Sequence, residues 1–211
     1  MKGLILKDLY NISHNAKSLF FTLIFLSICL IPSSGASGFA ITTTIIFSMM
    51  TLTTFSLDER SKWAKYALIM PVTRKDYVKA KFVVNFIFSL AGTVIGSIIA
   101  CIGEIVKGTF EPVTLLVCCG MGLCLGVFFG SLFIPLIIKW GTEQARMVSV
   151  VAVAVPSLLI YVLYMLLKVV FGVVFTDSLV IALLVATPVV VGLISYCSYL
   201  ISVRLFKMQE F

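Results

Sequence analysis

Residues Asp58 to Lys81 read DERSKWAKYALIMPVTRKDYVKAK, and this charged segment separates two long apolar stretches. Elsewhere the chain is strongly apolar, because 61% of its 211 residues are hydrophobic and its mean hydropathy is +1.16. Such a composition is typical of a protein embedded in lipid. The segment is therefore the one long part of the chain that must face water.

The apolar stretches predict how often the chain crosses a bilayer. A helix needs about 20 mostly apolar residues to span the hydrocarbon core. Six segments qualify: Ser18–Pro32, Ser37–Leu57, Phe82–Gly103, Pro112–Ile138, Val148–Phe171 and Ser178–Val203. The first is short unless its helix extends back to about His14. Residues 1–15 have apolar residues at helical spacing, with Lys2, Asp8, Asn11 and Asn15 available for a wet face.

These segments predict an all-α, polytopic membrane protein with six transmembrane helices and an N-terminal interfacial helix. An even number of spans places both termini on one side, together with 14 of the 16 Lys and Arg residues. Only Lys107 and Lys168 fall on the other side. By the positive-inside rule, both termini are expected in the cytoplasm of a cell-membrane protein. The net charge of +7 then indicates contact with anionic lipid rather than nucleic acid.

The residues needed for several kinds of chemistry are missing from the sequence. It has no phosphate-binding loop of the Gly-x-x-x-x-Gly-Lys-Ser/Thr type. His14 is the only histidine, and the six cysteines form no metal-ligand pattern. No predicted span has an ionisable residue at its centre, which argues against ion-coupled transport. Energy for any uphill transport must then come from another chain.

Small residues recur at helical spacing in two predicted spans. Gly92 and Gly96 lie four residues apart, and so do Gly122, Gly126 and Gly130. Such ridges allow helix backbones to approach closely in lipid. The pattern fits packing within one subunit or a contact between subunits.

Two sequence motifs resemble a known family. Residues Leu68–Tyr77 read LIMPVTRKDY, and Ile134–Arg146 read IPLIIKWGTEQAR. The chain opens with MKGLILKD, as the start of an interfacial helix. Together these resemble the small six-span permeases of type-2 ATP-binding-cassette (ABC) exporters of Gram-positive bacteria. The resemblance covers the whole chain in the number and order of spans.

The resemblance implies a single permease domain over 1–211, with a coupling loop at 58–81 and a second inner loop at 139–147. Such a subunit forms half of a translocation path, dimerises, and carries no cofactor, because ATP and Mg bind the partner ATPase. Relatives often export amphipathic or hydrophobic peptides, including antimicrobial ones, and a near-absence of polar groups inside the spans agrees with such a cargo. The residues implied in ATPase coupling are Asp58, Glu59, Arg60, Lys62, Trp63, Tyr66, Pro71, Arg74, Gly141 and Arg146.

The residues add their own expectations for this region. A helix over 58–65 would expose Glu59, Lys62 and Trp63, and Thr73 is suited to cap the helix that follows. Arg74 could instead hold an N-terminal turn or a lipid headgroup, and the whole segment could be a solvated connector loop.

Two different classes of protein also fit the sequence: a secondary transporter or channel, and a non-transporting immunity or sensor protein.

Overall fold

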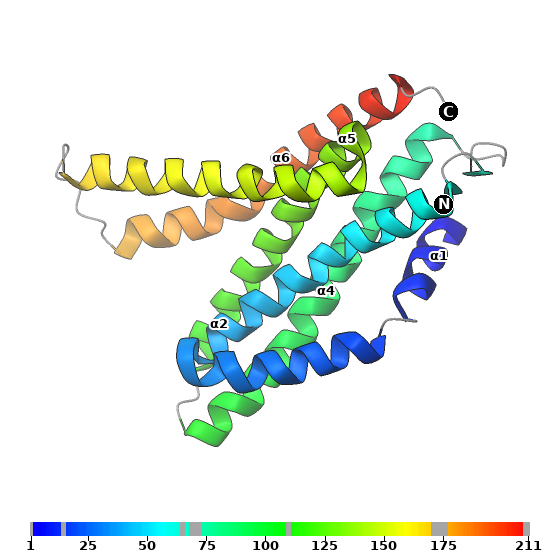
Figure 1. Ribbon diagram of the computed structural model, residues 1–211. Helices are drawn as coiled ribbons and strands as arrows, with labels where there is room; N and C mark the ends of the chain where they lie inside the picture. The colour runs from blue at the N-terminus through cyan, green and yellow to red at the C-terminus, as the bar shows by residue number, and fades with distance from the viewer. Residues whose placement is uncertain are drawn as a thin grey trace.

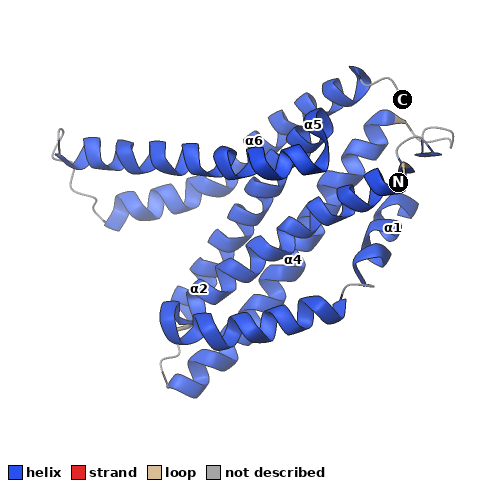
Figure 2. Cartoon of the chain, viewed as in Figure 1, coloured by secondary structure: helices blue, strands red, loops and turns tan. Residues whose placement is uncertain are grey.

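The computed structural model describes residues 2–13, 16–63, 66–67, 73–108, 111–169 and 177–208, and within them it describes side chains except those of 16, 33–34, 149–157, 159–169 and 177–183. The described part is helical, without strands (Figure 2). The helices are α1 (Lys2–Ser13), α2 (Ala16–Arg60), α4 (Arg74–Lys107), α5 (Pro112–Val169) and α6 (Asp177–Met208). The start of α1 and the end of α6 lie at the same end of the molecule (Figure 1).

Helix α2 consists of two arms that meet at Gly35. This residue has φ 78° and ψ 170°, a conformation that glycine adopts without steric cost. Pro32 precedes it and lacks the N–H that a continuing helix needs. The spans predicted to end at Pro32 and to begin at Ser37 are therefore joined by a sharp corner, after which α2 folds back along the bundle (Figure 1).

Helix α5 has a matching corner at Gly141, with φ 78° and ψ 171°. Residues 139–147, predicted as a loop, are helical on both sides of this single residue. The loop prediction was wrong in form because one glycine is enough to redirect the chain. The two arms of α5 run in clearly different directions (Figure 1).

The charged segment also differs from its predicted form. Helix α2 ends at Arg60, and Lys62 has φ 51°, so the expected helix over 58–65 is not continuous. Residues 64–65 and 68–72, with Pro71 among them, lie outside the described residues. Thr73 caps α4 as predicted, because its side chain accepts a hydrogen bond from the backbone N–H of Asp76.

Four described helices are long and apolar enough to cross a membrane: Gly35–Arg60, Arg74–Lys107, Pro112–Val148 and Leu184–Met208. A fifth span is possible if Lys2–Ser13 and Lys17–Pro32 count as one, bent by 63°. The chain is thus a multi-pass membrane protein. Six spans and an interfacial α1 stay predictions, since the expected span Val148–Phe171 lies largely outside the described side chains.

The glycine ridges pack inside the subunit. A methyl group at Gly92 would lie 2.6 Å from Cβ of Phe47, and one at Gly122 would lie 3.2 Å from Cα of Ile41. Both neighbours belong to α2, whose second arm packs against α4 and α5. Close helix approach in lipid depends on such small residues. The structure therefore uses these ridges for packing within one chain.

Candidate functional site

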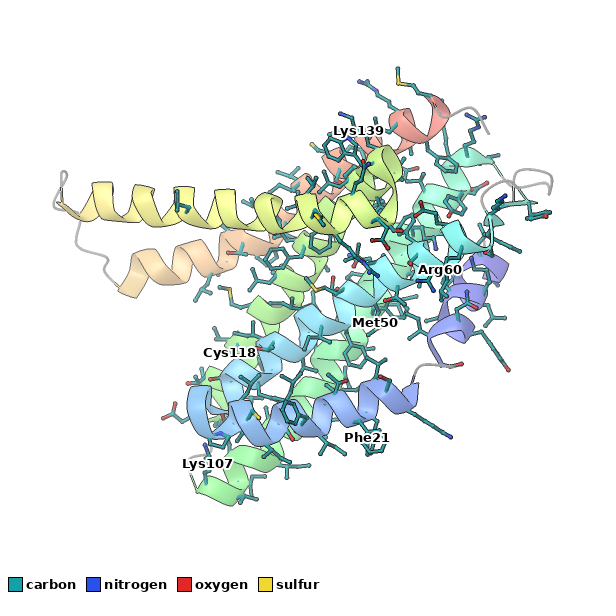
Figure 3. All side chains as sticks on the ribbon, in the orientation of Figure 1. Phe21, Met50, Arg60, Lys107, Cys118 and Lys139 are labelled. Carbon is teal, nitrogen blue, oxygen red and sulfur yellow. The ribbon has the colours of Figure 1, made fainter. Side chains whose placement is uncertain are left out.

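Most of the predicted coupling residues lie at one end of the bundle. This charged end consists of the end of α2, the start of α4, the corner of α5 and the end of α6. Arg60 and Lys139 lie toward this end, whereas Lys107 lies at the opposite one (Figure 3). The charge asymmetry of the sequence is therefore also an asymmetry in space.

Four charged side chains form a buried cluster at this end. Nζ of Lys81 lies 2.8 Å from Oδ2 of Asp8 and 2.7 Å from Oδ2 of Asp58. Nζ of Lys7 lies 3.2 Å from Oδ1 of Asp8 and also pairs with Asp58. The side chains of Lys81 and Asp8 are each only 2% exposed. Two cations and two anions cancel, as burial of charge requires.

Neighbouring groups complete this buried charge cluster. The Tyr77 hydroxyl donates to Oδ2 of Asp58 at 3.0 Å, and Lys81 donates to Oγ1 of Thr54 at 3.3 Å. Nζ of Lys81 also lies 4.7 Å from the centre of the Phe55 ring, within range for a cation–π contact. The cluster thereby fastens α1, α2 and α4 together.

Two expectations from the sequence change as a result. Asp8 was expected on the wet face of α1, but it is 1% exposed and paired with Lys81. Asp58 was expected to take part in ATPase coupling, and its carboxylate is directed into the protein. Sequence reasoning missed Lys7, Asp8 and Lys81 as partners. The only signal was that Lys81 borders an apolar span without a nearby acidic residue on the same helix face.

Glu59 joins the two segments that were predicted as inner loops. Its Oε2 accepts the backbone N–H of Thr142 at 2.9 Å and also the Thr142 hydroxyl. Thr142 opens the second arm of α5, directly after the corner at Gly141. The first N–H groups of a helix lack partners within it, and a carboxylate there is favoured by the helix dipole. This Glu59–Thr142 bridge therefore couples the end of α2 to the corner of α5.

Arg74 joins α4 to the end of α6. Its guanidinium donates to the carbonyl of Lys207 at 2.7 Å and to that of Phe206 at 3.3 Å. A cation is favoured at the C-terminus of a helix, where carbonyl groups lack partners. The Tyr77 and Phe206 rings stack beside it with centroids 5.0 Å apart. This capping of the α6 C-terminus was not among the roles expected for Arg74.

Several other predicted residues remain on the surface of the charged end. Arg60, Lys62 and Arg146 are exposed, and Tyr66 is 58% exposed. Trp63 is only half-buried, packs against the core, and has Nζ of Lys7 4.8 Å from its ring. We call the exposed set at the charged end, which is the end that carries the Glu59–Thr142 bridge, the end face. Its members are Arg60, Lys62, Tyr66, Lys139 and Trp140.

A buried polar seam within the spans was not foreseen. Oδ1 of Asn85 accepts from Ser48 at 3.0 Å and from Thr51 at 3.2 Å. Nδ2 of Asn85 lies 3.5 Å from the carbonyl of Val127 on α5. The expectation of almost no polar groups inside the spans was therefore wrong. These groups satisfy one another between α2, α4 and α5, as polar groups in lipid must.

Fold and site define a helical, multi-pass membrane protein with charged contacts gathered at one end. Comparison with family models supplies the identity: the ABC-2 family transporter protein model matches residues 3–207. The chain belongs to this family and is a permease component of an ABC transporter, which implies association with an ATP-binding-cassette partner. Neither the curated proteins nor the solved structures gave a match.

Proposed function

We propose that this chain forms half of the translocation path of an ATP-driven exporter and binds a separate ATPase subunit at the end face. ATP and Mg bind to that ATPase, and a second copy of the chain completes the path. The charged end lies on the cytoplasmic side of the cell membrane, in line with the excess of Lys and Arg at this end. Amphipathic or hydrophobic peptides are the proposed cargo.

The observation that carries this proposal is the Glu59–Thr142 bridge. It lies between exposed Arg60 on α2 and exposed Trp140 on α5. A partner that binds the end face and shifts it would therefore move α2 and α5 together. The buried charge cluster extends this connection, because Asp58 is adjacent to Glu59 and holds α1 and α4 through Lys7 and Lys81.

Such a connection would transmit movement of the ATPase subunits rigidly to the helix bundle. ATP binding would draw two ATPase subunits together, and each would tilt the bundle it holds. The corners at Gly35 and Gly141 mark where the long helices change direction. The α2 arm between Gly35 and Arg60 is firmly packed, so it would carry the displacement into the membrane.

Tyr66→Ala is expected to weaken ATPase binding about thirtyfold, the loss of about 2 kcal/mol that is typical of an interfacial aromatic anchor. Tyr66 is 58% exposed, so truncation leaves the folded core intact. The measurement is a titrated pull-down of the ATPase subunit by tagged permease at matched expression.

Phe21→Ala is the matched control, because Phe21 is an aromatic residue that is 71% exposed on α2 and lies away from Arg60 and Lys139 (Figure 3). It should bind the ATPase like the parent. Equal binding by the Tyr66 variant, the control and the parent would show that the ATPase docks elsewhere.

A further inference from the structure

A groove of about 590 Å³ opens between α4, α5 and α6. This volume is in the range of pockets that bind small molecules. The lining is mainly apolar, with a basic residue and a few hydroxyl and amide groups. The residues that matter here are Lys79, Phe82, Phe86, Val127, Ser195 and Tyr196.

The groove runs from the charged end into the apolar belt. Lys79, Phe82 and Phe86 follow one another at spacings of three and four on α4, which places them along one face of the helix. Seven residues of helix span about 10 Å. The groove is open to the side, because Phe86 is 47% exposed and Tyr196 is 61% exposed. A ligand can therefore enter from the surrounding lipid.

Two polar groups of the groove are available to a ligand. Lys79 is exposed, whereas Lys81, two residues further on, is paired with Asp8 and Asp58 in the buried charge cluster. Oγ of Ser195 is buried without a hydrogen-bond partner, although serine in a helix commonly bonds back to the preceding turn. An unpaired buried hydroxyl is costly. An acceptor oxygen on a ligand would satisfy it once the Ser195 side chain rotates toward the groove.

We propose that this groove binds an acidic phospholipid, with its phosphate at Lys79 and one acyl chain along Phe82, Phe86 and Val127. The positive mouth complements an anionic headgroup, and an ester oxygen matches the Ser195 hydroxyl. An acyl chain needs no hydrogen bonds from the apolar walls, whereas a peptide would need partners for its backbone. Basic sites between transmembrane helices on the cytoplasmic side are suited to acidic headgroups.

That the groove lies in the inner leaflet of the membrane rests on the topology given in the proposed function. The preference for an acidic lipid does not depend on an ATPase. The test uses the full chain in nanodiscs or mild detergent, and native mass spectrometry counts retained phosphatidylglycerol and phosphatidylcholine. The parent is expected to prefer phosphatidylglycerol about fivefold, which corresponds to about 1 kcal/mol for one basic residue.

Two variants and a control sharpen the test. Lys79→Gln should abolish the fivefold preference, and Ser195→Leu should reduce retention of both lipids by filling the groove. Lys75→Gln removes an exposed lysine one turn earlier on α4, outside the groove, and should behave like the parent. Thermal unfolding of each variant confirms that it is folded.

Three outcomes overturn the proposal. The first is equal retention of both lipids by the parent, and the second is an unchanged preference in Lys79→Gln. The third is a dimer that Ser195→Leu disrupts, which would assign the groove to a second copy of the chain. Because the ATPase is absent from the measurement, failure of the lipid site leaves the ATPase-docking result independent.

Discussion

Lys81→Met is expected to destabilise the protein by about 3–5 kcal/mol, the usual cost of removing one partner from a buried ion pair. Asp8 and Asp58 would then share Lys7 alone, with one negative charge left uncompensated in a buried site. For a chain of this length the midpoint of thermal unfolding should fall on the order of 10 °C. The measurement is a thermal melt of purified protein in mild detergent.

The charge balance provides a second variant that isolates the cause. Lys81→Met combined with Asp8→Asn restores equal numbers of positive and negative charges, so it should recover much of the lost stability. Lys75→Met, an exposed residue of the same helix, is the control and should melt like the parent. A Lys81→Met melt within about 2 °C of the parent, on a scale of about 2–4 °C per kcal/mol, would contradict the importance of the cluster.

Gly130→Ala is expected to cost about 2–4 kcal/mol, from overpacking and from hydrogen bonds left unmade. A methyl group at Gly130 would lie 1.8 Å from Oδ1 of Asn85. Asn85 would have to rotate away, and Ser48 and Thr51 would lose their shared acceptor. Thermal melts measure the loss of stability.

Gly120→Ala is a control on the same helix with the opposite expected sign. Nothing lies within 4 Å of a methyl group at Gly120. Alanine is a better helix former than glycine by about 1 kcal/mol, so this variant should melt at or above the parent temperature. Equal melting of the two variants would show that the polar seam around Asn85 does not hold the helices.

The overall class of fold followed from the sequence because it depends on long apolar runs, and these are local. Thr73 as a helix cap and the turn near Pro32 were likewise predictable from neighbouring residues. The corner at Gly141 was not, since a single glycine between two helical arms leaves no gap in the pattern. It was predicted as a loop because Lys139 to Arg146 is polar.

The site was less predictable because its contacts join residues far apart in the sequence. Asp8 and Lys81 are separated by 73 positions, and Glu59 and Thr142 by 83. Because it is charged, Asp58 was expected at the surface, yet its carboxylate is buried and paired with Lys7 and Lys81. Sequence reasoning recognised that the two charged segments matter. Only the structure shows that one hydrogen-bonded carboxylate, Glu59, links them.

Coupling to a separate ATPase is tested by purifying the tagged chain from its native membrane and measuring ATP hydrolysis before and after bound proteins are stripped away. We expect that an ATP-binding-cassette subunit co-purifies, that the complex hydrolyses ATP, and that the stripped chain does not. Hydrolysis by the stripped chain, or purification without any such subunit under conditions that preserve complexes, would contradict the assignment as an ATPase-coupled permease.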